Sequence, residues 1–552
     1  MCLLQKNWFY TVIIFCCFLT NSYAGNIYVA TTGSDSAPND GTIGKPYLTI
    51  NKAAQVAVAG DVVIIKSGTY MPTSSIVVAN EGTSSAPFTF MAEVKDGVII
   101  DGTNSPTPNS GDRQGMFTIL GTTTNSKSWI VVDGLRVINS KWAGIYSRYS
   151  DNIIVKNCST NNTWASGIIA ANSSNIKVLN NKVQQACMHP QVSPKQNTNE
   201  CITMASVATF EVAYNTVSDR LTDPSNGGEG IDAKNACTNG TFHHNTVTTL
   251  TRIAIYIDAF SGNLSNVEVY ANKVSGSDGG GITIASESGG VVDGVKLHDN
   301  LIYNNKRFGI RLAGYLDNGP LRNVDVYQNT IVNCGFSAGS WENVGLLIEA
   351  TNATNSGFNI RNNIISGCPF QIRGNNQTFP VTIDRNLLFG ATVLSGTNVI
   401  TLNPLFVNAA AFDFRLASGS PAINVALGSP LSTMDFYDGA RPIGLGSDLG
   451  AFEFNPALSI ADNTVDYKSK LNVFPNPANE LINVNFESIS GMKCDILLYD
   501  LQGRLIYKSN VISPNVGMNT YTIKSDNFDI GTYILTVSYS NGFSSSSKIL
   551  IQ

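Results

Sequence analysis

Charged residues are scarce in this chain of 552 residues: Asp, Glu, Lys and Arg together make up 14%, and the formal net charge is −5. The chain therefore lacks the broad basic surface with which proteins bind nucleic acid, and we expect no nucleic-acid partner. An acidic protein can still bind an anionic substrate, but only through a local basic patch or a bound cation.

Long hydrophobic runs are absent beyond the N-terminus, which predicts that the mature chain has no membrane-spanning helix. At the N-terminus, Lys6, an apolar run over residues 8–19 and the small residues around Ala24 are typical of a signal peptide. We therefore predict a signal peptide over residues 1–24 and a mature chain that begins near Gly25 and works outside the cytoplasm.

Cysteines with the spacing of a zinc site are also absent. Three of the ten cysteines lie in the predicted signal peptide, and the remaining seven are an odd number, so at least one is unpaired or pairs between chains. Cys187 and Cys201 flank a loop that contains His189, and a disulfide between them would close that loop. Spacing alone does not decide whether the disulfide forms.

The chain is rich instead in one short phrase: an apolar residue, two variable residues, Asn, one variable residue and a second apolar residue. The Asn of the phrase stands at positions 181, 215, 245, 272, 300, 329, 363 and 386, and Cys158 takes its place in an earlier copy. A fixed phrase with variable spacers indicates stacked structural units whose loops differ in length.

Each unit also contains a second short segment in which apolar residues alternate with others, often after Gly. These segments are GIYSR (144–148), GIIAA (167–171), GIDAK (230–234), AIYID (254–258), GITIA (281–285), GIRLA (309–313) and GLLIE (345–349). Alternation with period two predicts strands, and stacking them in parallel predicts a right-handed parallel β-helix. The recurring Asn would then form an internal ladder of amides from coil to coil. A β-propeller fits less well because its blades need longer units.

The rest of the chain completes an all-β architecture. Residues 26–30 read as a first strand, and residues 49–60 as a short amphipathic helix that caps the open end of the stack. We predict a β-helix over residues 25–402, a closing segment over 403–455, a linker over 456–470 and a small β-sandwich over 471–552. We expect the protein to be a monomer.

Both ends resemble known secreted proteins. GDVVIIKSGTY (60–70) resembles the opening of β-helix proteins active on polysaccharides. LNVFPNPANE (471–480), LYDLQGRLIY (498–507), GTYILTV (531–537) and the final KILIQ resemble the C-terminal sorting domain of the type IX secretion system in Bacteroidetes. This resemblance implies export by the type IX machinery, followed by release or attachment to the cell surface. An immunoglobulin-like carbohydrate-binding module is the alternative.

Aligning the coils on their inward residues brings unusual side chains together on one outer face. The candidate catalytic residues are Asp232, Lys234, Tyr256, Asp258, Glu287 and Arg311, which fall on four neighbouring coils. The candidate substrate-binding residues that flank them are His189, Arg252, Arg307 and Trp341. Lys234 and Asp258 occupy the same column on adjacent coils, so an ordinary surface ion pair is the simpler interpretation.

Two stretches of these coils resemble family 9 pectate lyases. EGIDAK (229–234) is similar to a phrase of that family, and GIRLAG (309–314) is similar to the segment that carries its catalytic base. The resemblance implies that Glu229 binds calcium and that Arg311 stands in the position of the base. The consecutive aspartates of the family are replaced by Tyr256 and Asp258. From the residues themselves, Glu229, Asp232 and Asp258 could supply hard oxygen ligands for Ca²⁺.

We predict a lyase that cleaves an anionic, uronate-containing polysaccharide by β-elimination, with Lys234 or Arg311 as base or carboxylate clamp and Tyr256 or water as acid. A glycoside hydrolase is the main alternative, because Asp232 and Asp258 would lie about 8 Å apart at their Cα atoms, and Glu287 could replace either. A uronate C5-epimerase and a glycan-binding surface protein without activity also remain open.

Overall fold

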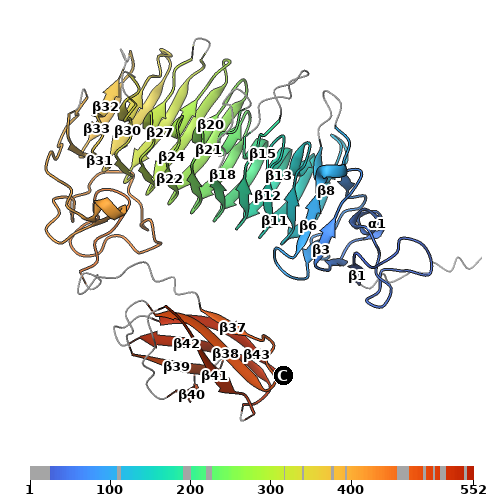
Figure 1. The fold of residues 1–552 in the computed structure, drawn as a ribbon. Helices are drawn as coiled ribbons and strands as arrows, with labels where there is room; N and C mark the ends of the chain where they lie inside the picture. Colours follow the sequence, from blue (N-terminus) through green and yellow to red (C-terminus); the bar gives the residue numbers. More distant parts are fainter. Residues whose placement is uncertain are drawn as a thin grey trace, which may run out of the picture. The chain divides into compact units, whose positions relative to one another are not determined.

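A computed structural model describes residues 25–107, 114–189, 200–218, 227–315, 318–337, 341–374, 378–391, 394–456, 471–488, 493–500, 504–509, 517–526, 528–539 and 544–552. The predicted signal peptide, most of the predicted linker, and parts of the loops before Glu200 and before Trp341 lie outside these residues. The chain divides into two units, with the boundary between Pro456 and Ala457 (Figure 1).

The first unit is the predicted right-handed parallel β-helix, and its coils are built from three faces. Face 1 comprises β4 (Ile76–Val77), β7 (Gly115–Leu120), β10 (Ala143–Arg148), the first part of β13 (Ile168–Leu179) and of β15 (Ile202–Ala213), β17 (Ile231–Lys234), β20 (Ile253–Asp258), β23 (Gly280–Ala285), β26 (Phe308–Leu312), β29 (Val344–Ile348) and β32 (Phe370–Gly374). Face 2 comprises β1 (Asn26–Val29), β2 (Val62–Ile65), β5 (Phe88–Ala92), β8 (Lys127–Asp133), β11 (Ser150–Lys156), the second part of β13 and of β15, β18 (Thr238–His243), β21 (Asn263–Tyr270), β24 (Val291–His298), β27 (Leu321–Tyr327), β30 (Ser356–Arg361) and β33 (Val381–Asp384).

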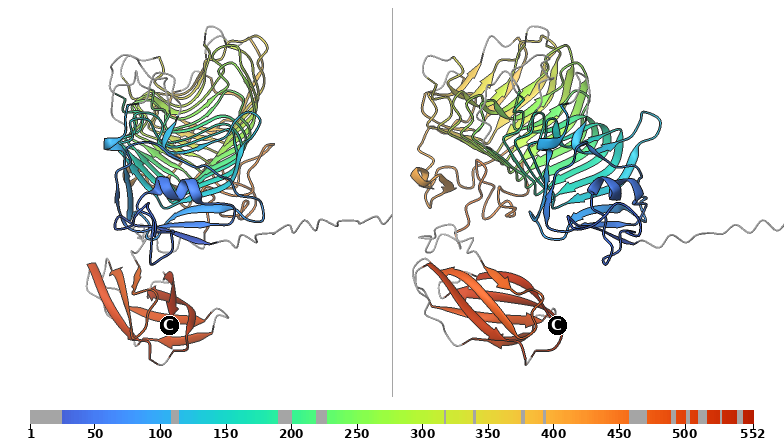
Figure 2. Two further views of the ribbon diagram at one scale, coloured as in Figure 1. Left: turned by 90° about the vertical axis from the view of Figure 1, so that its right-hand side faces the viewer. Right: turned by 45° about the vertical axis from the view of Figure 1, so that its right-hand side comes forward.

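Face 3 is a separate parallel sheet of short strands. It comprises β3 (Gly68–Tyr70), β6 (Val98–Asp101), β9 (Arg136–Ile138), β12 (Ser159–Asn161), β14 (Lys182–Gln184), β16 (Thr216–Ser218), β19 (Thr246–Thr248), β22 (Lys273–Ser275), β25 (Leu301–Tyr303), β28 (Thr330–Val332), β31 (Ile364–Ser366) and β34 (Leu387–Phe389). Viewed along the stack, successive coils superpose (Figure 2, left).

The predicted alignment of the coils is confirmed along face 1. Paired residues run from Ile145 through Ile168, Ile202, Ile231, Ile255, Ile282 and Ile310 to Leu346, and all of them are buried. Because side chains alternate along a strand, the residues just before and just after each of these buried residues point away from the core. The register of the inward column therefore determines which side chains share the outer face.

The predicted asparagine ladder is also present, at the corner between faces 2 and 3. The amide nitrogen of Asn272 donates to Oδ1 of Asn300 at 3.0 Å, and Oδ1 of Asn272 accepts the amide of Asn245 at the same distance. The same bond joins each neighbour from Asn181 to Asn386. The residue before each of these asparagines has a positive φ, so the chain turns tightly there and directs the amide inward.

The N-terminal end is closed as the sequence predicts. Helix α1 (Ile50–Val56) begins after Thr49, whose side chain accepts a hydrogen bond from the backbone nitrogen of Lys52 and caps the helix. Its buried residues Ile50, Ala53 and Ala54 belong to the same apolar core as the coils. The helix thus covers apolar surface that the first coil would otherwise expose.

Residues 403–455 contain β35 (Phe406–Asn408), the 3₁₀ helix η3 (Ala409–Ala411) and β36 (Asp413–Leu416). This closing segment packs against the side of several coils as well as near the last one. Phe414 and Phe452 share an apolar cluster with Tyr303 and Val332 of face 3. Arg441 is fully buried and pairs with Asp299 at 3.0 Å and with Glu453 at 3.1 Å.

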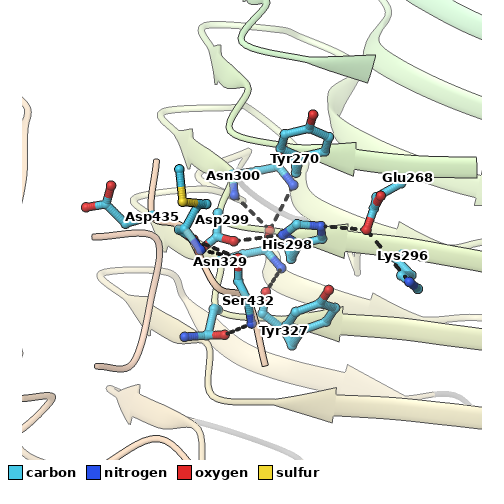
Figure 3. A network of polar contacts seen from close by, with 12 residues as sticks. Glu268, Tyr270, Lys296, His298, Asp299, Asn300, Tyr327, Asn329, Ser432 and Asp435 are labelled. Atoms are coloured by element: carbon cyan, nitrogen blue, oxygen red, sulfur yellow. Dashed lines mark hydrogen bonds and ion pairs between the residues drawn. The ribbon is translucent and has the colours of Figure 1, made fainter. Parts of the chain in front are cut away.

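Asp299, which pairs with Arg441 of the closing segment, also contacts a histidine, and Figure 3 shows this second contact. His298 lies 2.7 Å from Asp299 through Nδ1 and 3.0 Å from Glu268 through Nε2, and its ring stacks between Tyr270 and Tyr327. Burial alone would lower the pKa of His298, but the hydrogen bonds to the two carboxylates outweigh it and raise the pKa above its ordinary value.

This histidine predicts a pH-dependent stability. A raised folded-state pKa contributes stability that is fully present below about pH 6.5 and is lost as pH rises through the folded pKa. We expect the melting temperature of the wild type to fall over this range more steeply than that of His298→Gln. Thermal unfolding between pH 5.5 and 9 measures the difference, with His189→Gln as the control. Equal slopes in wild type and His298→Gln would contradict the prediction.

The second unit is the predicted small β-sandwich. One antiparallel sheet holds β37 (Asn472–Phe474), β38 (Leu481–Ser488) and β41 (Gly517–Lys524). The other holds β39 (Cys494–Asp500), β40 (Leu505–Lys508), β42 (Gly531–Tyr539) and β43 (Ser544–Ile551). Apolar residues of both sheets form one core.

Two further observations concern the described residues of the whole chain. Their seven cysteines are buried, and Cys187 and Cys201 form no disulfide in this structure. None of the helices in these residues has the length and apolar character that crossing a membrane requires.

Candidate functional site

The candidate site lies on face 1, where four coils carry polar side chains at outward positions. Asp232, Tyr256, Thr283 and Arg311 form one column of paired residues, and Lys234 and Asp258 are paired in the next column. The predicted register of these residues is therefore confirmed. Asp232 is nevertheless 0% exposed and Asp258 1% exposed, so the carboxyl groups are covered although they point away from the core.

Lys234 is the centre of this arrangement. Its Nζ lies 2.6 Å from Glu200, 3.5 Å from Asp232 and 3.9 Å from Asp258. Burial alone would lower the pKa of Lys234, but the three carboxylates together raise it. The amine is therefore held in its charged form, and with about a quarter of its side chain exposed it is also the part of the group that solvent reaches.

Glu200 is the contact that the sequence prediction did not include. It is 2% exposed, and its second oxygen accepts a hydrogen bond from the hydroxyl of Thr203 at 2.9 Å. Glu200 and Glu229 both stand two residues before an inward isoleucine, Ile202 and Ile231, and this shared position is the sequence feature that could have identified it. The two glutamates occupy the same corner of neighbouring coils.

Glu229 has a different partner from the other acids. Arg252 donates a hydrogen bond from Nε to its carboxylate, and Glu229 is 4% exposed. Burial raises the pKa of Glu229, and Arg252 partly opposes that rise. We refer to Glu200, Glu229, Asp232, Lys234, Arg252 and Asp258 as the Lys234 cluster. The cluster holds four carboxyl groups and two cations.

Burial strongly perturbs Asp232 and Asp258 in the Lys234 cluster. Both oxygens of Asp232 are buried without a hydrogen-bond donor, and burial raises its pKa well above the ordinary value. Burial, reinforced by the charge of Glu287, raises the pKa of Asp258 to about 7, although Phe260 donates a backbone hydrogen bond to it at 2.7 Å. Asp258 is thus poised to exchange a proton near neutral pH.

Tyr256 joins the Lys234 cluster to Glu287. Its hydroxyl donates a hydrogen bond to the Glu287 carboxylate and lies 3.2 Å from the hydroxyl of Tyr315. Burial raises the pKa of Tyr256 well above its ordinary value, and the nearby Tyr315, Asp258 and Glu287 reinforce the effect. The phenol therefore stays protonated and can act only as a proton donor.

Arg311 is bound to other acids. Its Nε donates to Glu349 at 2.6 Å, and a terminal nitrogen lies 3.8 Å from Glu342. Burial opposes the charged form of Arg311, but Tyr315, Glu349 and Glu342 raise its pKa. Arg307 is half exposed and also pairs with Glu342, at 3.3 Å.

The remaining flanking residues have other surroundings. His189 is buried, and its ring packs edge-on against Trp164. Trp341 is 42% exposed, and its backbone oxygen accepts a hydrogen bond from Arg373. Much of the loop that contains His189, and part of the loop that contains Trp341, lie outside the described residues.

The expected calcium ligands Glu229, Asp232 and Asp258 do not converge on one point. Within the described residues, no three Asp, Glu, His or Cys side chains form a metal site, since Lys234 lies among the carboxylates and Glu229 is directed to Arg252. The donor chemistry nevertheless suits a hard cation, because Asp232 keeps two buried oxygens without a donor and its neighbours are carboxylates.

The buried Asp258 predicts a change in the pH dependence of stability. A raised folded-state pKa contributes stability that is present below the ordinary value of 3.8 and is lost as pH rises to about 7. We expect the free energy of unfolding of Asp258→Asn to fall less steeply with pH, by about 1 kcal/mol per pH unit in this window. Denaturant unfolding at several pH values measures it. The exposed Asp278→Asn is the control, and an unchanged slope in Asp258→Asn would refute the prediction.

The chain is similar to known families over parts of its length. Residues 27–199 match a family described as "Pel9A-like, right handed beta helix region", and residues 118–292 match "Right handed beta helix region". Residues 472–552 match "Secretion system C-terminal sorting domain". The predicted sorting domain is confirmed, and it directs the chain through type IX secretion to the cell surface or the extracellular space. The Pel9A-like match ends one residue before Glu200, so it does not include the Lys234 cluster.

Individual proteins are also similar to parts of the chain. Pectate lyase PEL9 of Emericella nidulans is 34% identical over 178 residues, which are 31% of this chain and 41% of the relative. The chain therefore matches less than half the length of that relative. The uncharacterized protein YwoF of Bacillus subtilis is 40% identical over 76 residues, or 14% of this chain and 15% of its own. The crystal structure of pectate lyase Pel9A covers 79% of this chain and 97% of its own, at 15% identity and a TM-score of 0.43.

Proposed function

We propose that this protein is an extracellular lyase that cleaves a uronate-containing polysaccharide, of the pectate or alginate kind, by β-elimination. The observation that carries the proposal is the excess of buried carboxyl groups in the Lys234 cluster, together with the two oxygens of Asp232 that have no donor. Four carboxyl groups beside two cations favour a bound cation, which would replace the protons that burial holds on the carboxyl groups, and a bound cation suits an anionic sugar.

Calcium is the cation that the donors suit, with Asp232 as its first ligand and Glu229 as a second if Arg252 moves away, while Asp258, the third expected ligand, is left free to exchange a proton. When bound, a hard divalent cation neutralises the uronate carboxylate and makes the neighbouring proton more acidic. Lys234 also favours an anionic substrate, because the ammonium group of its partly exposed side chain can pair with the substrate carboxylate.

The proton transfers are assigned from the pKa values. The sequence left Lys234 and Arg311 open as base or clamp, and their raised pKa values favour the clamp. Asp258, with a pKa of about 7, takes the proton from the carbon next to the uronate carboxylate. The electron pair of that C–H bond forms the double bond as the glycosidic C–O bond breaks. Tyr256 donates its phenolic proton to the departing oxygen after its hydrogen bond to Glu287 breaks, and the phenolate then takes a proton from water.

A glycoside hydrolase is the second candidate, and the pair of perturbed aspartates favours it. Asp232 and Asp258 each have an oxygen within 4 Å of Lys234 Nζ, at 3.5 Å and 3.9 Å, so these oxygens are separated by at most the sum of the two distances. That limit allows the carboxyl spacing of about 5–5.5 Å in retaining enzymes and the lower part of the roughly 6.5–9.5 Å range in inverting ones.

One experiment separates the two reactions. Polygalacturonate, alginate and neutral polysaccharides are incubated with the full chain, with added Ca²⁺ or with chelator, and products are followed by ultraviolet absorbance and by reducing-sugar release. We expect reducing ends and absorbance to rise together on a polyuronate and to stop with chelator. Reducing ends without absorbance would replace the lyase with the hydrolase, and binding without either would leave a glycan-binding protein.

A further inference from the structure

Arg148 differs from the other bases near the candidate site in having no acidic partner. Lys234, Arg252, Arg307 and Arg311 are each paired with a carboxylate. Among the described residues, Arg148 makes no ion pair. Its guanidinium group donates one hydrogen bond, at 2.9 Å, to the neutral hydroxyl of Tyr149, and its Nε is buried without a partner.

The position of Arg148 connects it to the Lys234 cluster. It is the last residue of β10 and is paired with Ala171, which is paired with Ala205, which in turn is paired with Lys234. Arg148 and Lys234 therefore stand in one outward column, three coils apart. With about 4.8 Å between coils, their Cα atoms are separated by roughly 14 Å.

The two residues that separate Arg148 from Lys234 in this column are small and uncharged. Ala171 and Ala205 carry only a methyl group, so within this column of described residues no long side chain stands between Arg148 and Lys234. A shallow strip along a solenoid, with a cation at each end, suits an extended polymer whose charges recur along its length.

Arg148 is also held in a defined position. Its guanidinium carbon lies 4.6 Å from the ring centroid of Tyr149, which is a cation–π contact. Tyr149 has a positive φ of 48°, the turn that brings its ring beside the preceding residue. A guanidinium group fixed on an aromatic ring, with no carboxylate partner of its own, can bind a carboxylate with little loss of side-chain entropy.

We infer that Arg148 forms a second carboxylate-binding subsite, about three coils from the reacting sugar, and that the substrate is a polyuronate long enough to reach both Lys234 and Arg148. The inference rests on the proposed function and goes further, because it requires charged units along the chain rather than one uronate among neutral sugars. Short oligomers can occupy only one of the two cations and should bind more weakly.

Binding without turnover provides the test. Oligogalacturonates of two to ten units, and a neutral cello-oligosaccharide, are titrated calorimetrically into the full chain with chelator present. We expect Arg148→Ala to weaken binding of the longest uronate about ten-fold and to leave the dimer unchanged, because a charge-assisted hydrogen bond is lost only where the substrate reaches it. Arg148→Lys should restore part of the affinity. Arg136→Ala, an exposed arginine on β9, is the matched control.

The outcomes distinguish this inference from the proposed function. A wild type that binds long uronates through Arg148 but cleaves none would remove the lyase and keep the subsite. Equal affinity of Arg148→Ala and wild type for every uronate length would overturn the subsite even if the protein is a lyase. Failure of the wild type to bind any uronate both with chelator and with added Ca²⁺, or equal binding of the neutral oligosaccharide, would overturn it as well.

Discussion

Replacing Lys234 with alanine is expected to lower kcat on the preferred polyuronate by about a thousand-fold or more. Lys234 is the exposed member of a group in which three carboxylates surround one amine, and no other side chain can supply that charge at the same point. Without it, the substrate carboxylate would face Glu200, Asp232 and Asp258 directly.

The same substitution affects folding, and the experiment has to separate the two effects. Removing the amine leaves buried carboxylates without their cation, which costs about 3–5 kcal/mol in comparable buried pairs. Because Asp232 and Asp258 have raised pKa values, protonation relieves this cost at low pH. Lys234→Ala should therefore melt much earlier than wild type at pH 8 and only slightly earlier at pH 5.

The activity measurement is made where the variant is folded. Initial rates are compared at pH 5 to 6, after tryptophan fluorescence confirms the folded state, with Lys234→Arg and the exposed Lys182→Ala beside it. We expect Lys182→Ala to match wild type and Lys234→Arg to keep part of the activity, since it retains the charge but not the geometry. A folded Lys234→Ala with wild-type kcat would show that the Lys234 cluster is not the active site.

The architecture could be predicted from the sequence because two local patterns determine it. The period-two segments identify face 1, and the Asn phrase marks the corner where a residue of positive φ turns the chain. Once Ile231 and Ile255 are aligned, the pairing of Asp232 with Tyr256 and of Lys234 with Asp258 follows, because side chains alternate along a strand. The positions of the site residues on the strands could therefore be predicted from the sequence.

The contacts within the site could not be predicted from the sequence, because they depend on the paths of loops and on the directions of side chains. Glu200 follows a loop of variable length, and nothing in the sequence shows that it approaches Lys234 more closely than Asp258 does. Whether Lys234 serves as base or clamp depends on how many carboxylates surround it. The path of residues 403–455 along the coils depends on single long-range contacts such as that of Arg441 with Asp299.

The asparagine ladder gives the second large prediction. Asn272 is fully buried, and its amide nitrogen bonds to Oδ1 of Asn300 and to the backbone oxygens of Phe242 and Tyr270, while its own oxygen accepts from Asn245. Asn272→Ala leaves several of these groups buried without partners. We expect a loss of about 3 kcal/mol or more in the free energy of unfolding, since each buried unsatisfied group costs about 1–3 kcal/mol.

Tryptophan fluorescence during urea unfolding measures this loss in the β-helix alone, because all five tryptophans precede residue 457. The control is Asn263→Ala, an exposed residue on β21, which should change stability by less than about 0.5 kcal/mol. Asn272→Asp retains the acceptor, loses both amide donors and adds a buried charge, so it should cost more than alanine at pH 7 and less at pH 4. If Asn272→Ala proved as mild as Asn263→Ala, the ladder would be a consequence of coil stacking and not one of the interactions that hold the coils in register.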